Sequence, residues 1–282
     1  MSQLKTTGCQ AINNIFSPEI CSSCGDINEG FLCEKCRRSI AEIKNISCNL
    51  CGAPFTVNKE PSSIKDNSGG LLSDEVISKK QALKTNPDLN NAGNNDKKKA
   101  GCPVCRDSEY SFYRLRSFGI YSGILKELII KFKYRKIYTL APVLTGFLKK
   151  AYLENYFSET IDYVDTVPDF VDFRSAASDS ASQAQNHMQI LVKMFSKETG
   201  IPYGDNIIKI KKTLKQHNLG LYERKVNLEG VFKAQSVLSA CKKNILLIDD
   251  VWTTGNTLNG ISQALKKCGA KNIYLLTIAR AV

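Results

Sequence analysis

The spacing of apolar and polar residues predicts alternating strands and helices from residue 111 to the end of the chain. Alternating or short apolar runs predict strands over residues 111–121, 161–167, 206–211, 245–250 and 272–279. Helical spacing predicts helices over residues 123–134, 137–157, 183–199, 221–227 and 257–267. Pro168 follows the second strand, and Gly200 follows the third helix, as residues that end such elements commonly do. The order indicates an α/β fold with a mostly parallel sheet flanked by helices.

Polar side chains gather where the strand over residues 245–250 ends. Asp249 and Asp250 close the strand, and a loop rich in hydroxyl groups leads into the next helix. Parallel sheets bind their ligands at the carboxyl ends of strands. A helix N-terminus offers free backbone N–H groups and a positive dipole end to phosphate. The pattern therefore predicts a sugar-phosphate site, whose binding residues would be Asp249, Asp250, Thr253, Thr254, Gly255, Asn256 and Thr257. A strand, an acidic turn and a helix cap that bind no ligand are the alternative.

Eight of the eleven cysteines form four Cys-x-x-Cys pairs in the first 105 residues. Each such turn places two thiolates on one side of a tight loop, and two turns complete the tetrahedral shell that Zn²⁺ prefers. The simplest arrangement is sequential. One zinc would be held by Cys21, Cys24, Cys33 and Cys36, and a second by Cys48, Cys51, Cys102 and Cys105.

Other uses of these cysteines are open at this point. A cross-braced pairing, or zinc at only one of the two sites, fits the same spacing. Redox chemistry and disulfides are weaker alternatives, because redox Cys-x-x-Cys motifs usually occur singly near a βαβ unit. With four sulfur ligands each, the predicted zinc ions are structural and leave no open position for chemistry. His187 and His217 have no ligand spacing and are not counted as zinc ligands.

Composition divides the chain into two predicted domains. Residues 1–110 would form a double zinc ribbon, and residues 111–282 an α/β domain. Residues 56–100 are polar and have no aromatic residue, so we expect a disordered insertion in the second ribbon. No apolar run approaches the roughly 18 residues of a membrane span, and the N-terminus lacks the apolar core of a secretory signal. We therefore expect a cytoplasmic protein without a membrane span, with reduced cysteines.

The chain carries a formal net charge of +12, which favours anionic partners such as nucleotides or nucleic acid. Residues 114–150 hold nine Lys or Arg and one acid, and residues 209–233 hold seven and two. Bases stand beside aromatic residues, as in Lys131-Phe132-Lys133-Tyr134-Arg135. These segments are either solvated basic faces or a groove for pyrophosphate or a nucleic-acid backbone.

The order strand, Asp-Asp, two residues and Thr-Thr-Gly-x-Thr resembles the phosphoribosyl pyrophosphate (PRPP) signature of type I phosphoribosyltransferases. The resemblance implies that Asp249 and Asp250 contact the ribose 2- and 3-hydroxyls. It also implies that residues 253–257 wrap the 5-phosphate, and that Mg²⁺ bridges ribose and pyrophosphate.

A wider resemblance, to the ComF family, covers nearly the whole chain outside the insertion. Its motifs are the paired cysteines, Leu128-Ile129-x-Lys131-Phe132-Lys133-Tyr134, Thr213-x-x-Gln216-x-x-Leu219 and Glu223-Arg224-x-x-Asn227-Leu228-x-Gly230-x-Phe232. ComF proteins are linked to DNA uptake in natural transformation. The resemblance implies a type I phosphoribosyltransferase-like domain behind a double zinc ribbon, with single-stranded DNA and uptake proteins as partners.

Two functions follow as hypotheses. The first is an enzyme that transfers ribose 5-phosphate from PRPP to an unknown acceptor, with Asp249, Asp250 and Arg224 as catalytic residues. Lys212 and Lys215 would join Arg224 in closing over pyrophosphate. The second is a non-catalytic PRPP sensor or a module that binds single-stranded DNA.

One departure from the ComF pattern favours the second hypothesis. ComF proteins usually carry an Arg-rich segment and then Arg-Gly-Phe-Asn-Gln after the strand that ends in Val-Pro. Here only Arg174 and then Gln183-Ala184-Gln185-Asn186-His187 follow Pro168. Loss of an arginine and a glycine there should weaken pyrophosphate binding.

Overall fold

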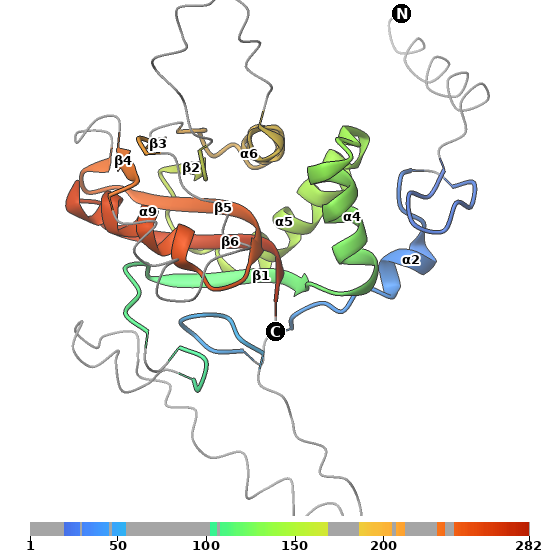
Figure 1. Cartoon of the computed structure of the whole chain (residues 1–282), viewed down its shortest axis with the longest axis horizontal. Helices are drawn as coiled ribbons and strands as arrows, with labels where there is room; N and C mark the ends of the chain where they lie inside the picture. The colour runs from blue at the N-terminus through green and yellow to red at the C-terminus, as the bar shows by residue number, and fades with distance from the viewer. Residues whose placement is uncertain are drawn as a thin grey trace, which may run out of the picture.

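The computed structural model describes residues 20–28, 30–44, 47–54, 102–105, 108–168, 186–204, 207–211, 230–234 and 240–281 (Figure 1). At its centre is a parallel sheet with the strand order β1-β6-β5-β2. These strands are β1 (Arg114–Ile120), β2 (Tyr163–Thr166), β5 (Asn244–Trp252) and β6 (Asn272–Arg280). The helices are α2 (Glu34–Arg38), α4 (Gly123–Tyr134), η3 (Tyr138–Leu140), α5 (Ala141–Asn155), α6 (His187–Thr199) and α9 (Asn256–Lys267).

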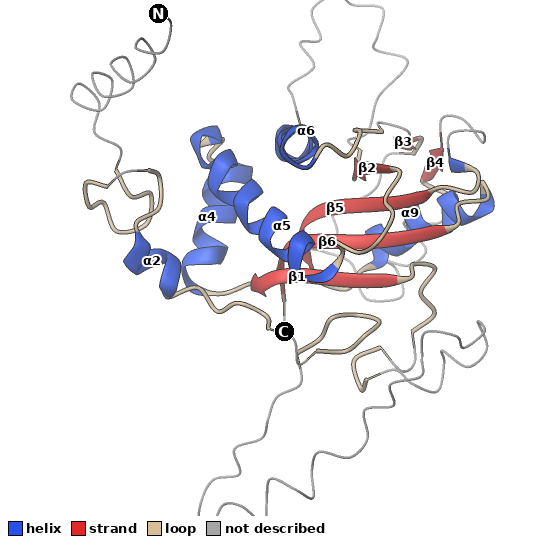
Figure 2. Ribbon diagram, turned by 180° about the vertical axis from the view of Figure 1, so that it is seen from behind, coloured by secondary structure: helices blue, strands red, loops and turns tan. Residues whose placement is uncertain are grey.

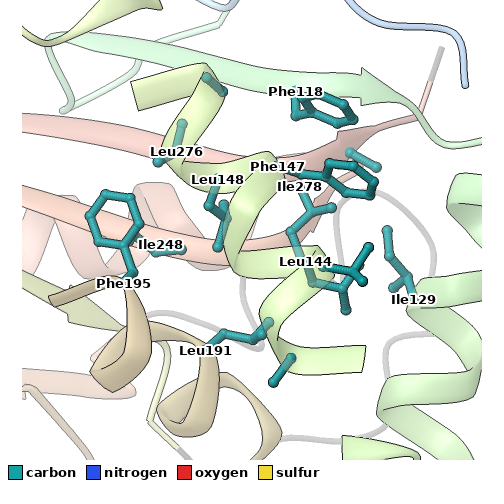
Figure 3. Close-up of a cluster of buried hydrophobic side chains, with 14 of the residues drawn as sticks. Phe118, Ile129, Leu144, Phe147, Leu148, Leu191, Phe195, Ile248, Leu276 and Ile278 are labelled. Atoms are coloured by element: carbon teal, nitrogen blue, oxygen red, sulfur yellow. The ribbon is translucent and has the colours of Figure 1, made fainter. Parts of the chain in front are cut away.

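Helices cover both faces of the sheet because its central strands are apolar on both sides. Leu246 and Ile248 of β5 face α4, α5 and α6 in one buried cluster, part of which Figure 3 shows. Ile245 and Leu247 face α9 in a second cluster. In Figure 2, α5 lies in front of the sheet, on the face opposite α9, and residues of α6 belong to the same buried cluster as those of α5. Alternate residues of one strand thus supply two cores, and the predicted α/β class is confirmed.

The cysteine-rich N-terminal part lies along the exposed edge of β1. The backbone N–H of Leu115 donates to the carbonyl of Leu50 at 2.8 Å, and that of Ile120 donates to the carbonyl of Ala41 at 2.8 Å. A Cβ on Gly52 would lie 2.7 Å from the carbonyl oxygen of Leu115, so only glycine allows this approach. The N-terminal part therefore satisfies backbone groups that an edge strand would leave open.

Most predicted elements form, with small shifts at their ends. The long helix predicted over residues 137–157 is a short 3₁₀ helix followed by α5, with Pro142 in the first turn of α5. β5 runs two residues past Asp250, to Trp252. A strand that the sequence does not predict, β4 (Phe232–Ala234), pairs antiparallel with β3 (Ile207–Lys209). The predicted insertion over residues 56–100 and the predicted helix over residues 221–227 lie outside the described residues.

No described helix combines the length and the apolar character that crossing a membrane requires.

Candidate functional site

The two carboxylates at the end of β5 occupy different surroundings. Asp250 is 5% exposed, whereas Asp249 is half-buried. Successive side chains of a strand point to opposite faces, so Asp250 continues the row of Leu246 and Ile248 toward α4 and α6. Oδ1 of Asp249 accepts a hydrogen bond at 2.9 Å from the backbone N–H of Asp250. Asp249 is therefore the more accessible of the two acids.

Asp250 is held by two cationic or ionisable groups from different helices. Nζ of Lys133, at the end of α4, lies 2.5 Å from its Oδ2. Nε2 of His187, the first residue of α6, lies 3.5 Å from the same oxygen. Within the described part of the chain this buried Nε2 makes no hydrogen bond. The carboxylate of Asp250 thus ties α4 and α6 to the end of β5.

These contacts move the pKa values of the two acids in opposite directions. Burial, together with the charge of Asp250, raises the pKa of Asp249 to about 8, against a smaller opposing effect of Lys133. Burial alone would raise the pKa of Asp250, but the contact with His187 and the charge of Lys133 outweigh it and lower that pKa to about 2. Asp250 is consequently a paired carboxylate, and Asp249 keeps its proton more readily.

The loop that follows β5 has the shape expected of a phosphate cradle. Gly255 is in the left-handed conformation with φ of 76°, and it precedes the first residue of α9. Thr253 is exposed, and Thr254 and Thr257 are half-buried. Among the described residues, no side chain caps the N-terminus of α9. Backbone N–H groups and hydroxyl groups therefore converge at a positive helix end, an arrangement that binds phosphate.

Trp252 forms the floor beneath this loop. A Cβ on Gly255 would lie 1.9 Å from the indole ring, so no other residue fits there without moving the ring. The indole is 2% exposed and makes edge contacts with Phe112 and Tyr110, at centroid distances of 5.7 and 5.8 Å. Trp252, Phe112 and Tyr110 thus form an aromatic cluster that supports the loop at Gly255.

The beginning of α6 lies at the same edge of the sheet. Thr166 ends β2 beside Ile248, and its hydroxyl donates to the Ile248 carbonyl at 2.9 Å. Asn186 caps α6 by accepting from the backbone N–H of Met188 at 2.8 Å, and its amide donates to the carbonyl of Val167 at 3.5 Å. Asn186 and His187, the last residues of the altered ComF segment, therefore lie at the acidic end of β5.

The eight paired cysteines form two groups in the sequential arrangement. Cys21, Cys24, Cys33 and Cys36 make the first cluster, and Cys48, Cys51, Cys102 and Cys105 the second, each with all sulfur atoms within 4.8 Å of one another. Gly25 and Gly52, which follow two of the pairs, have φ of 83° and 64°, as tight knuckle turns require.

The sulfur separations fit zinc. Tetrahedral Zn²⁺ with Zn–S bonds near 2.3 Å requires sulfur atoms about 3.8 Å apart. In the second cluster, the sulfur atoms of Cys51 and Cys102 are 3.5 Å apart, those of Cys102 and Cys105 3.6 Å, and those of Cys48 and Cys105 3.8 Å. Cys24 and Cys33 in the first cluster are 3.7 Å apart. Both clusters therefore suit four-coordinate structural zinc.

Two functional side chains escaped the sequence analysis in their actual roles. The sequence places Lys131 and Lys133 in a basic segment that is either a solvated face or a groove for anions, but Lys133 is paired with Asp250, and Lys131 with Glu127 at 2.5 Å. His187 was set aside for lack of ligand spacing, yet it lies against Asp250. No periodicity in the sequence joins these residues to β5. Arg174, Lys212, Lys215 and Arg224 lie outside the described residues.

Comparisons with known proteins match a family model and several relatives of this chain. Residues 11–66 match the model of the double zinc ribbon domain. The DNA utilization protein YhgH of Salmonella typhi is 30% identical over 76 residues, which cover 27% of this chain and 33% of that protein. A solved structure of the allosteric regulatory enzyme of purine biosynthesis is 17% identical in sequence. The match covers 53% of this chain and 30% of the chain in that structure. Its TM-score of 0.35 is too low to carry an argument.

Competence protein F of Haemophilus influenzae is the relative with the broadest match among these. It is 30% identical over 185 residues, which cover 64% of this chain and 78% of that protein. A match of this extent covers more than three quarters of the relative rather than a single motif. The chain therefore belongs to the competence protein F family.

Proposed function

We propose that the protein binds PRPP as its magnesium complex and transfers ribose 5-phosphate to an acceptor, releasing pyrophosphate. The observation that carries this proposal is the edge of the sheet where Asp249 stands beside the hydroxyl-rich loop. Residues 253–257 comprise this loop and the first two residues of α9, whose start has no side-chain cap among the described residues. A sugar phosphate needs both features, a carboxylate for its hydroxyl groups and N–H groups for its phosphate.

In this proposal the loop holds the 5-phosphate. The backbone of Gly255 allows close approach, and Thr253, Thr254 and Thr257 supply hydroxyl groups. Asn256 begins α9, where the helix dipole favours negative charge. The phosphate can bind in this way only if the loop keeps the conformation in which Gly255 packs against the Trp252 ring.

Asp249 would accept hydrogen bonds from the ribose hydroxyls in this site. Asp250 would act chiefly by fixing the end of β5, because Lys133 and His187 already occupy its carboxylate. The oxygen donors at this edge are of the type that Mg²⁺ prefers. Magnesium would neutralise charge on the leaving pyrophosphate.

The transfer itself needs positioning rather than a nucleophilic side chain. The bond between the ribose anomeric carbon and pyrophosphate breaks, and its electrons leave with pyrophosphate. A lone pair of the acceptor forms the new bond to the same carbon, and the acceptor releases its proton to pyrophosphate or water. In its ionised form, Asp249 would stabilise the positive charge that develops on the ribose ring. Arg224, with Lys212 and Lys215, is proposed to contact the pyrophosphate.

We assign this activity to an α/β domain over residues 111–282 and structural zinc to a ribbon domain over residues 1–110. The relatives are named for competence and for DNA utilization, so the proposal places the reaction in the handling of DNA taken up by the cell. We also propose that the protein is cytoplasmic, because a reducing compartment keeps the cysteines as the thiolates that bind zinc.

Pyrophosphate release tests the transfer. The zinc-loaded protein would be mixed with PRPP, Mg²⁺ and each of a series of nucleobases, and pyrophosphate would be measured by a coupled assay. We expect release that depends on one base class and disappears in Asp249→Asn. Release by Asp249→Asn at the wild-type rate would refute the assignment of the site.

A module that binds single-stranded DNA is the second candidate, and one surface favours it. Tyr134 is 64% exposed and Tyr138 is 39% exposed, next to Arg135 and Lys136 at the end of α4. Exposed aromatic rings among bases suit stacked nucleotides.

This second candidate predicts that an oligonucleotide binds without PRPP. Its affinity should weaken steeply as salt is raised, because phosphate contacts release counterions. Tyr134→Ala should lower the affinity, whereas Leu153→Ala, which changes an exposed apolar residue on α5, should leave it unchanged. Equal effects of the two substitutions would count against this surface.

A further inference from the structure

Arg280, the last residue of β6, is a buried cation that touches the second cysteine cluster. Its side chain is 3% exposed. Nη1 donates to the carbonyl oxygen of Cys51 at 2.5 Å, and Nη2 lies 3.8 Å from Sγ of the same cysteine. The guanidinium group thus contacts one of the four sulfur atoms predicted to bind zinc.

The metal cluster supplies the charge that this arginine needs. A buried cation is costly unless an anion pairs with it. Over the described residues, no carboxylate lies within ion-pair distance of Arg280. Four thiolates outweigh the charge of one Zn²⁺, so the filled second cluster is an anion next to the guanidinium. Without metal, nothing holds the four sulfur atoms in one shell, so the carbonyl and the sulfur of Cys51 that contact Arg280 are no longer fixed.

The other side of Arg280 contacts the floor of the phosphate loop. Its guanidinium carbon lies 5.9 Å from the centre of the Trp252 ring, in a cation–π contact. Arg280 and Trp252 are paired across β6 and β5, and the backbone N–H of Ala281 donates to the carbonyl of Trp252 at 2.8 Å. The ring in turn lies directly under Gly255. Contacts therefore run without a gap from Cys51 to the loop.

We propose that Arg280 is a positioning residue that makes the course of the phosphate loop depend on metal in the second cluster. When the cluster is filled, its charge holds the guanidinium, the guanidinium holds the indole, and the indole holds Gly255. Loss of that metal frees the guanidinium to leave the indole, and the indole then keeps only its contacts with Phe112 and Tyr110, so the loop is held less firmly. The coupling itself involves residues of this chain alone. Only its effect on a phosphoribosyl ligand rests on the proposed function.

The first cluster and Arg116 provide internal controls. The first cluster contacts α4, through the Ser22 carbonyl and Lys131, rather than the phosphate loop. Arg116 donates to the carbonyl oxygens of Cys48 and Asn49, at 3.3 and 3.1 Å, so it also fastens the second cluster. Among its described contacts none is with Trp252.

Trp252 is the single tryptophan of the chain, so its fluorescence reports on the loop without any ligand. Emission would be recorded from the full-length protein while zinc is removed by a chelator and then restored, with released zinc measured in parallel. We expect wild type and Cys24→Ser, which keeps the second cluster, to show a reversible emission shift. Cys102→Ser, which keeps only the first cluster, should show none on removal of its zinc.

Arg280→Met removes the guanidinium group that is proposed to couple the second cluster to the loop, and it leaves the cysteines of that cluster in place. We expect this variant to lose most of the metal-dependent emission shift, Arg280→Lys to keep part of it, and Arg116→Met to keep nearly all of it. Thermal unfolding identifies any variant that fails to fold. If Arg280→Met fails to fold, the comparison of Cys24→Ser with Cys102→Ser still shows whether the emission shift depends on zinc in the second cluster.

Two outcomes would overturn the inference. One is an emission shift that follows zinc in the first cluster as strongly as zinc in the second. The other is a full metal-dependent shift in folded Arg280→Met.

PRPP binding separates this inference from the proposed function. If PRPP binds, we expect loss of metal from the second cluster to weaken it about tenfold in wild type, within the usual range of coupling between sites, and far less in Arg280→Met. If PRPP does not bind but the emission shift follows Arg280, the coupling stands and the proposed function fails. If PRPP binds with the same affinity with and without that metal, the coupling fails and the proposed function stands.

Discussion

Nζ of Lys133 and Oδ2 of Asp250 lie 2.5 Å apart, and this ion pair joins the end of α4 to the end of the central strand β5. The carboxylate is 7% exposed at the side chain and the lysine 32%. A pair this deep is costly to break, because the remaining charge is left without compensation. The pair therefore fixes Asp250 as part of the frame and leaves Asp249 to face a ligand.

Replacing Lys133 should destabilise the fold. We expect Lys133→Met to lower the free energy of unfolding by about 2 kcal/mol, less than for a fully buried pair because part of the lysine reaches solvent. The double variant Lys133→Met/Asp250→Asn should recover much of this loss. Urea unfolding measures both. Lys126→Met, an exposed position on the same helix, is the control and should change stability little. Full additivity in the double variant would contradict the pairing.

The raised pKa of Asp249 predicts how stability changes with pH. The pKa of about 8 in the folded state lies above the ordinary value near 4, so the folded state holds a proton that the unfolded state releases. The stability from this group is fully present below about pH 4 and is lost as pH rises through about 8.

We therefore expect the stability of wild type relative to Asp249→Asn to fall between pH 5 and pH 8. The decrease should be at most about 1.4 kcal/mol per pH unit. Urea unfolding of both proteins across that range tests this. A difference that is constant or grows with pH would show that Asp249 is not held protonated.

Gly255 should not tolerate a side chain. We expect Gly255→Ala to cost at least about 1 kcal/mol from the left-handed backbone alone, and more because its Cβ would overlap the Trp252 ring. Gly146→Ala in α5 is the matched control. A Cβ there meets no other atom within 4 Å, so the helix should gain about 0.5–1 kcal/mol. Thermal unfolding compares the two, and equal effects would contradict the loop geometry.

Zinc content should follow the two clusters. We expect two zinc ions per purified chain, one for each group of four cysteines. Cys24→Ser and Cys102→Ser should each lose one ion, whereas Cys241→Ser, an exposed cysteine outside both clusters, should keep both. Elemental analysis measures this. Retention of two ions in Cys102→Ser would contradict the second cluster.

Features that depend on local spacing could be predicted from the sequence. Helical spacing predicted both ends of α4 correctly. The four Cys-x-x-Cys pairs predicted two clusters, and the sequential pairing, which was the simplest of the arrangements left open, is the one that forms. The acid pair and the loop were found because strand, turn and helix cap are neighbours in the chain.

Features that depend on distant contacts could not be predicted. Lys133 and Asp250 are 117 residues apart, and nothing in either segment indicates that they pair. Arg280 and Cys51 are 229 residues apart, and an arginine at the end of an apolar strand reads as exposed. β4 could not be predicted because a strand of three residues is too short to show an alternation of apolar and polar side chains. In each case tertiary packing, rather than local preference, decides the role of the residue.

Calorimetric titration of the zinc-loaded protein with PRPP and Mg²⁺ tests the central claim most directly. Wild type should bind one PRPP per chain, Asp249→Asn should bind far more weakly, and Lys197→Met, an exposed change on α6, should bind as wild type does. Absence of binding by folded, zinc-loaded wild type would contradict the phosphoribosyl site at the end of β5.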